Sequence, residues 1–99
     1  MNKCHFLGKV CYDPELHDDG VAVVNFELEV EEFRRDSNGE KVRTPTYLPF
    51  EAWDSAALAI HKYAEEGSLM AVEAIARNEE NEDGVEIYFR VTSFKILGL

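Results

Sequence analysis

Residues 46–53 have the sequence Thr46-Tyr47-Leu48-Pro49-Phe50-Glu51-Ala52-Trp53, which is typical of a β-strand. Side chains alternate between the two faces of a strand, so Leu48, Phe50 and Ala52 share one face, which is expected to lie in the core. Tyr47 and Trp53, the only tryptophan, then lie on the opposite face, where two outward aromatics make a stacking platform. This strand alone fits two hypotheses equally well: a ligand-stacking platform, or an interface covered by another subunit or a folded-back loop.

Two further strands are predicted before this stretch. Residues 3–11 mix β-forming residues with Gly8, whose missing side chain permits a bulge or a sharp bend. Residues 13–15 then break the strand pattern, and residues 18–20 supply the chemistry of a turn. Residues 21–33 alternate apolar and polar side chains, which predicts a long, half-buried strand.

A helix is predicted over residues 54–66. Asp54 or Ser55 can cap its N-terminus, its interior is rich in alanine, and Gly67 can end it. The apolar side chains expected to pack against one end of the sheet are Leu58, Ile60 and Tyr63.

Two more strands are predicted over residues 69–76 and 85–97, joined by an acidic hairpin loop at residues 78–84. The order is then three strands, one helix and two strands. A closed five-stranded barrel, with the helix between strands three and four, hides the strand edges and is the OB-fold arrangement. The predicted fold class is therefore all-β with one helix, and residues 1–99 are expected to form one domain.

The charge of the chain is strongly acidic: twenty acidic and ten basic residues give a formal net charge of -10. This is the wrong sign for a generic phosphate binder. The bases are unevenly placed, however, because four of the ten lie in a predicted hairpin loop over residues 34–44, at Arg34, Arg35, Lys41 and Arg43. The sequence therefore predicts a cationic loop on an acidic body.

Several classes of protein are disfavoured. No run of about 18 apolar residues and no signal-peptide block occurs, so a cytoplasmic location, in a bacterium or a phage-infected host, is expected. Cys4 and Cys11 are expected on opposite faces of one strand and cannot bridge within it, and with His5 and His17 they lack metal-site spacing. No phosphate-binding glycine motif, cofactor motif or nucleophile–histidine pair is recognisable, so no enzyme is predicted.

Short motifs with a common pattern extend over nearly the whole chain. They are Asn2-Lys3 opening into Phe6-Leu7-Gly8-Lys9-Val10, Asp13-Pro14-Glu15-Leu16, Gly20-Val21-Ala22-Val23 with Asn25-Phe26, Tyr63 before Gly67-Ser68, Val72-Glu73 and Asp83-Gly84. Together they make the chain similar to the single-stranded DNA-binding proteins of bacteria and phages, an OB-fold family. The resemblance departs at Glu66 and Ala74, where that family usually has a base and a glycine.

The resemblance implies roles for particular residues. Tyr47 and Trp53 match positions that stack on DNA bases, and Phe33 corresponds to a third, near the end of the second strand. Lys3 matches a basic position, and the 34–43 loop resembles a DNA-gripping hairpin. Independently of the resemblance, Arg77 is a further candidate for phosphate contact. Family members are usually homotetramers built from dimers that pair through strand one. They typically continue into a disordered linker and an acidic tip that recruits other proteins. No such recruitment tail is expected within these 99 residues.

Two functions therefore remain open from the sequence. The first is sequence-nonspecific binding and protection of single-stranded DNA in replication, recombination and repair, by base stacking and a basic hairpin. The alternative is an acidic OB-fold module that binds replication or repair proteins through its second strand and has little DNA affinity. Salt-dependent binding to an oligonucleotide distinguishes the two.

Overall fold

Six strands and one helix make up the computed structural model, which describes residues 1–98. In chain order the elements are β1 (Cys4–Val10), β2 (Glu15–Asp18), β3 (Ala22–Arg35), β4 (Lys41–Trp53), α1 (Asp54–Tyr63), β5 (Leu69–Asn81) and β6 (Gly84–Leu97).

Five of the strands close into a barrel. The sheet order is β1-β5-β6-β4-β3-β2, and a further pairing of β1 with β3 completes the ring. All pairings are antiparallel except that of β4 with β6, which is parallel and joins Glu51 to Arg90 and Phe50 to Phe89. With α1 between β4 and β5, this confirms the predicted five-stranded OB-fold barrel. The short β2 was not predicted, and it adds to the free edge of β3 outside the ring.

Gly8 lies where β1 passes close to β3. A Cβ atom there would lie 2.8 Å from the Glu29 carbonyl oxygen, closer than non-bonded atoms approach. Glycine is therefore needed for β1 to contact β3 at Lys9 and Val10 while it also pairs with β5. A register shift lies instead between β5 and β6, where the consecutive residues Glu73 and Ala74 pair with Ser93 and Val91 and Thr92 of β6 is skipped.

The core is built from the apolar faces of the long strands. Phe50 and Ala52 are buried, as residues 46–53 predict, and they face the alternating buried residues of β3. The Phe26 and Phe50 rings stack with centroids 5.3 Å apart, and Phe6 and Phe89 pack against Phe50 at 5.4 and 5.5 Å. This aromatic cluster lies directly behind the outward face of β4.

Helix α1 differs from the prediction at both ends. Its N-cap is Trp53, with no side-chain capping hydrogen bond, because β4 runs straight into the helix and Asp54 turns the chain with φ 57°. The predicted caps, Asp54 and Ser55, are therefore wrong. The helix ends at Tyr63 rather than at residue 66, because the amide of Glu66 donates to the side chain of Asp13 instead of continuing the helix.

Fewer side chains of α1 than predicted pack against the barrel. Ile60 is fully buried against the barrel together with Ala57. Leu58 and Tyr63, which were expected to pack with it, are about half exposed. α1 is the helix that the structure describes, and it is too short to cross a membrane.

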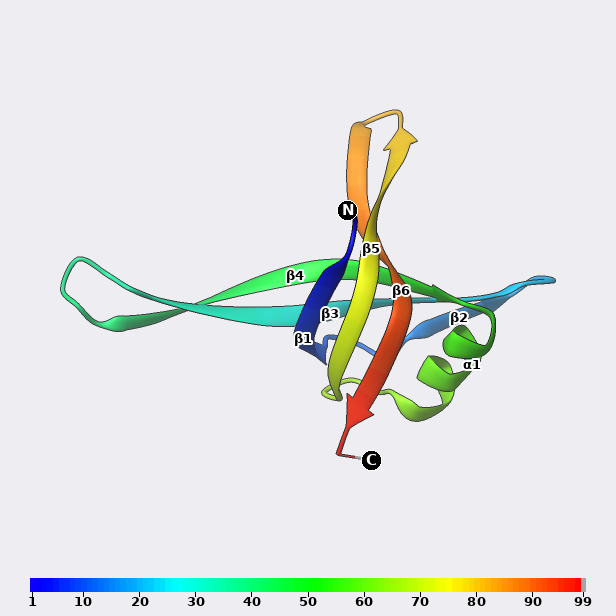
Figure 1. The fold of residues 1–99 in the computed structure, drawn as a ribbon, viewed down its shortest axis with the longest axis horizontal. Helices are drawn as coiled ribbons and strands as arrows, with labels where there is room; N and C mark the ends of the chain where they lie inside the picture. Colours follow the sequence, from blue (N-terminus) through cyan, green and yellow to red (C-terminus); the bar gives the residue numbers. More distant parts are fainter. Residues whose placement is uncertain (99) are drawn as a thin grey trace.

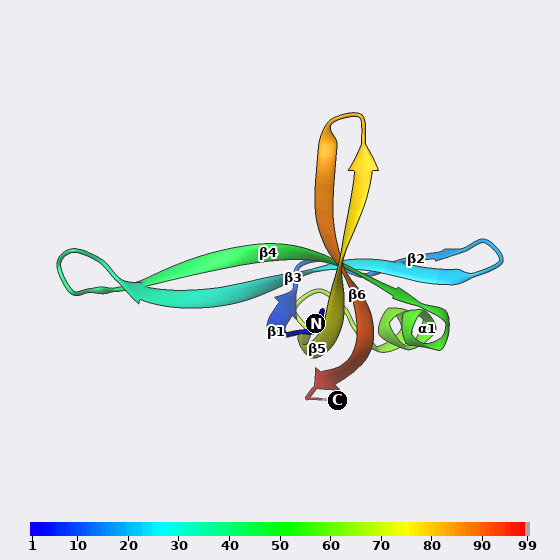
Figure 2. The ribbon, with the colours of Figure 1, turned by 45° about the horizontal axis from the view of Figure 1, so that its top comes forward.

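Two long hairpins project from the barrel (Figures 1 and 2). The first is called the β3–β4 arm, and the second, the β5–β6 arm, points away from the barrel in another direction. The cationic loop predicted over residues 34–44 is mostly strand, because β3 continues to Arg35 and β4 begins at Lys41, so the four bases lie on the strands of the first arm. The predicted acidic loop at residues 78–84 is mostly strand, because β5 continues to Asn81 and pairs there with Gly84. The molecule measures 54 × 39 × 26 Å along its principal axes.

Candidate nucleic-acid interface

The outward face of β3 and β4 carries both predicted stacking aromatics. Tyr47 lies opposite Glu29 and is 56% exposed, and Trp53 lies opposite Val23 and is 42% exposed. Their neighbours on the same strand, Phe50 and Ala52, are at most 2% exposed. The assignment of Tyr47 and Trp53 to the outward face of β4, made from the sequence, is therefore confirmed.

Trp53 is held by two charged neighbours. Its indole Nε1 donates a hydrogen bond to Glu51 Oε1 at 3.0 Å, and Arg90 Nε donates to the same oxygen at 2.9 Å. The Arg90 Cζ atom lies 5.0 Å from the centroid of the Trp53 ring. The hydrogen bond to Glu51 raises the pKa of the Arg90 guanidinium, so this group keeps its charge.

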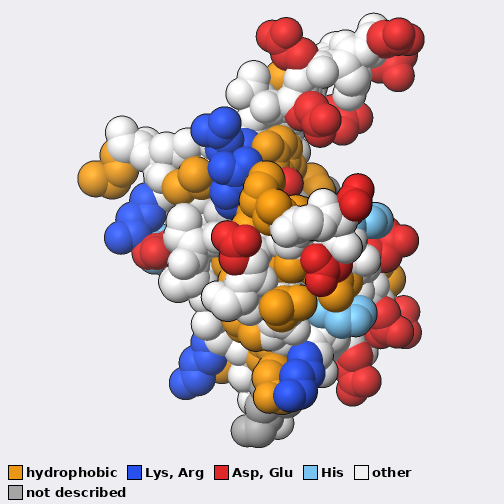
Figure 3. Space-filling view, turned by 90° about the vertical axis from the view of Figure 1, so that its right-hand side faces the viewer, with side chains coloured by type: hydrophobic (Ala, Val, Ile, Leu, Met, Phe, Trp, Pro, Cys, Tyr) orange, Lys and Arg blue, Asp and Glu red, His pale blue; other side chains and the backbone are white. Residues whose placement is uncertain are grey.

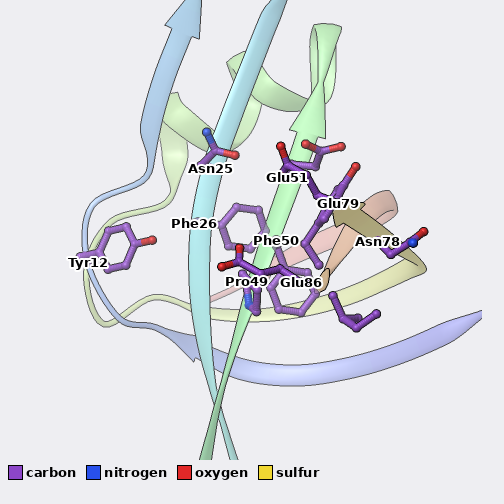
Figure 4. Close-up of a pocket in the computed structure, with 11 residues that line it drawn as sticks. Tyr12, Asn25, Phe26, Pro49, Phe50, Glu51, Asn78, Glu79 and Glu86 are labelled. Atoms are coloured by element: carbon purple, nitrogen blue, oxygen red, sulfur yellow. The ribbon is translucent and has the colours of Figure 1, made fainter. Parts of the chain in front are cut away.

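A groove of about 400 Å³ lies between the β3–β4 face and the β5–β6 arm (Figure 4). Its lining combines aromatic, amide and carboxylate side chains: Tyr12, Asn25, Phe26, Pro49, Phe50, Glu51, Asn78, Glu79, Glu86, Ile87 and Tyr88. Three of these are glutamates, of which Glu51 is ion-paired with Arg90. The groove can therefore hold a flat apolar group, but it offers few cations for a phosphate.

The tip of the β3–β4 arm presents cations and one aromatic ring. Phe33 is 51% exposed, and Lys41 Nζ lies 4.4 Å from the centroid of its ring. Arg35 Nη1 donates to the Gly39 carbonyl at 2.7 Å, which ties the two sides of the turn together. Within residues 1–98, Arg34, Arg35 and Lys41 make no ion pair, so their charges face solvent.

Arg43 differs from the other cations of this arm. Its Nη2 atom lies 2.5 Å from Glu29 Oε1 and 2.6 Å from Glu31 Oε1. These contacts raise the pKa of Arg43 and lower the pKa of Glu31. The side chain therefore neutralises the glutamates next to Tyr47 and is poorly placed to receive a phosphate as well.

The two remaining phosphate candidates lie on or beside β5. Lys3 Nζ is 3.2 Å from Glu73 Oε1, an ion pair that lowers the pKa of Glu73, and His5 Nε2 lies 3.7 Å from the same oxygen. Arg77 is exposed on the β5–β6 arm, opposite Tyr88. The structure therefore does not bring the six predicted cations into one patch: Arg34, Arg35 and Lys41 share a tip with Arg43, whereas Lys3 precedes β1 and Arg77 lies on β5.

Acidic side chains gather on the β5–β6 arm (Figure 3). They are Glu79, Glu80, Glu82, Asp83 and Glu86, all of them exposed. Residues 33–43, at the tip of the β3–β4 arm, hold four basic and two acidic residues, so the tips of the two arms carry opposite net charge. Elsewhere, no group of three potential metal ligands occurs within residues 1–98, and Cys4 and Cys11 are both free, as their spacing predicts.

Sequence reasoning missed Arg90 as a neighbour of Trp53. Arg90 lies within the predicted strand 85–97, but its contact depends on the parallel register between β4 and β6, which no local pattern encodes. The placement of Glu51 on the same face as Trp53 could be predicted, since the two residues are two apart on one strand.

The closed barrel, the exposed aromatics and the basic arm define an OB-fold protein with the kind of face that such barrels use for single-stranded nucleic acids. Residues 1–96 match the Single-strand binding protein family, and the chain belongs to this family.

Solved structures agree on the fold. Crystal structures of the single-stranded DNA binding protein from Thermus aquaticus, one wild-type and one of a deletion mutant, are similar to this chain with TM-scores of 0.84 and 0.87 and 19% identity. Each match covers 98% of this chain and 50% of the other, so this chain spans about half the length of those proteins. No curated protein matches it in sequence.

Proposed function

We propose that this chain binds single-stranded DNA without sequence specificity. The observation that carries the proposal is the exposure of Tyr47 and Trp53 on one face of β4, above a core that fixes the strand. Bases stack on such rings whatever their identity, because every base has an aromatic face. Membership of the single-strand binding protein family supports the same assignment.

The backbone of the DNA is expected to follow the β3–β4 arm. Arg34, Arg35 and Lys41 are the unpaired cations at its tip, and Phe33 offers a third stacking ring beside Lys41. Arg77 is a further candidate for phosphate contact. Lys3 and Arg43 are weaker candidates, since each would first have to leave a glutamate partner.

A binding titration with single substitutions tests this proposal. Tyr47→Ala and Trp53→Ala should each weaken binding of a labelled single-stranded oligonucleotide by about 1 to 3 kcal/mol without changing the unfolding midpoint. Leu58→Ala is the matched control, because Leu58 is 50% exposed but lies on α1. Equal affinity of the parent protein for single-stranded and duplex DNA, or full affinity of both aromatic variants, would contradict the assignment.

A second candidate function rests on the acidic surface. Glu27, Glu29 and Glu31 share the outward face of β3 and could recruit a basic protein partner. Arg43 already neutralises two of these three carboxylates, which favours DNA binding over this alternative. Absence of oligonucleotide binding even at low salt, where charge attraction is strongest, would reverse this preference.

The cellular setting follows from the family. Roles in replication, recombination and repair, a cytoplasmic location and a non-enzymatic activity are expected. Assembly into dimers or tetramers is expected through β1, which pairs with β3 only at Lys9 and Val10 and leaves the edge before them unpaired. Light scattering with and without oligo(dT) measures assembly and binding in one experiment.

A further inference from the structure

Glu51 joins two side chains of the stacking face through one oxygen atom. Its Oε1 accepts the indole hydrogen of Trp53 at 3.0 Å and the Nε hydrogen of Arg90 at 2.9 Å. The carboxylate is well enclosed, since its side chain is 16% exposed, and that of Arg90 is 35% exposed. Partial burial strengthens charged hydrogen bonds of this kind relative to those at an open surface.

The three side chains are fixed by the barrel itself. Glu51 and Trp53 lie two residues apart on β4 and therefore on one face, and Arg90 lies opposite Glu51 where β6 closes the barrel. The hydrogen bond from Nε1 sets the direction of the indole ring. The guanidinium, 5.0 Å from the ring centroid, then covers one side of the indole, while 42% of Trp53 stays exposed.

We infer that Glu51 is a positioning residue for base stacking and that Arg90 forms the backing layer of a base–indole–guanidinium stack. A base that contacts the open side of Trp53 meets a ring already held in place, so less rotamer freedom is lost on binding. The cation behind the ring also favours the stack electrostatically. This inference rests on the proposed function and adds the residues that organise its stacking site.

Glu51 differs from Glu27, a glutamate of the same face that makes no ion pair within residues 1–98. A carboxylate beside a DNA strand repels phosphate, so removal of an unpaired one should strengthen binding. The charge of Glu51 is already compensated by Arg90, and its loss would release both the indole and the guanidinium. Simple electrostatics and the positioning role therefore predict opposite signs for the same substitution.

The test compares Glu51→Ala with Glu27→Ala, which removes one carboxylate from the same face opposite Pro49. Glu51→Ala should weaken binding of a single-stranded oligonucleotide about 2- to 10-fold, the range expected for one lost hydrogen bond. Glu27→Ala should bind as tightly as the parent or more tightly. In the free protein, the fluorescence anisotropy of Trp53 should fall in Glu51→Ala but not in Glu27→Ala. Glu51→Gln keeps an acceptor oxygen, so its Trp53 anisotropy should be close to that of the parent protein.

Binding by Glu51→Ala that matches or exceeds that of Glu27→Ala would overturn the inference while leaving DNA binding intact. Failure of the parent protein to bind any oligonucleotide would instead overturn the proposed function, and with it the stack. If Glu51→Ala does not fold, Arg90→Lys carries the test, because lysine keeps the charge but lacks the planar group. Trp53 in its DNA complex should then become more accessible to acrylamide quenching, and unchanged quenching would refute the backing role.

Discussion

The unpaired cations at the tip of the β3–β4 arm make a quantitative prediction about salt dependence. Each phosphate neutralised on a single strand contributes about -0.7 to the slope of log affinity against log salt concentration. Replacing Arg34, Arg35 and Lys41 together by Ser should therefore make the slope less steep by about 2. Between 1 M and 0.1 M salt this corresponds to an affinity loss of about a hundredfold at the lower concentration, with the parent and variant curves converging at high salt.

The assay is fluorescence anisotropy of a labelled oligonucleotide at several salt concentrations. Lys62→Ser is the control, because Lys62 lies over the Tyr63 ring on α1 and its loss removes one charge away from the arm. A long-range effect of net charge would change the slope equally per charge in both variants. If the triple variant keeps its parental slope and affinity, the arm does not contact phosphate and the proposed DNA path is wrong.

Three substitutions test the fold that supports this face. Gly8→Ala should lower the free energy of unfolding by about 1 to 3 kcal/mol, because the new Cβ would lie 2.8 Å from the Glu29 carbonyl; an unchanged urea midpoint would contradict that close approach. Phe50→Ala should cost about 3 to 5 kcal/mol through loss of aromatic packing, and a loss under about 1 kcal/mol in thermal denaturation would refute its central position. At Asp54, with φ 57°, Val should be about 1 to 2 kcal/mol less stable than Gly, and equal midpoints would argue against the left-handed turn.

The barrel could be predicted because the sequence of each long strand shows which of its two faces is apolar. Alternation along β3 and β4 indicates which side of each strand is buried. The helix follows β4 and precedes the last two strands, and this order of elements limits the possible topologies. The failures are local and have two causes. β2 and the extension of β5 to Asn81 are hairpin pairings of short, mostly polar segments, in which no apolar alternation indicates a strand. The end of α1 at Tyr63 depends instead on a partner distant in sequence, the Asp13 side chain that accepts a hydrogen bond from the Glu66 amide.

The candidate site was predictable only in part, because the partners of its charged side chains depend on the pairing of strands. The outward placement of Tyr47 and Trp53 follows from one strand read alone, and the structure confirms it. The state of each charge does not follow from the sequence, because an arginine in a basic stretch looks the same whether it is free or ion-paired. Arg43 belongs to the predicted cationic loop, yet its position across the ladder from β3 brings it to Glu29 and Glu31.

The pairing of these cations bears on how an acidic chain can bind a polyanion. Arg43 neutralises two glutamates near Tyr47, and Arg90 neutralises Glu51 next to Trp53, so the charges beside both stacking rings are compensated within the protein. Arg43 and Arg90 are therefore not available to neutralise phosphates. The cations at the tip of the β3–β4 arm are then the main groups that displace counterions from the DNA. Affinity should therefore depend more on stacking than on charge. A Trp53→Ala substitution should then weaken binding by the same factor at low and high salt, whereas the substitutions at the tip lose their effect as salt rises.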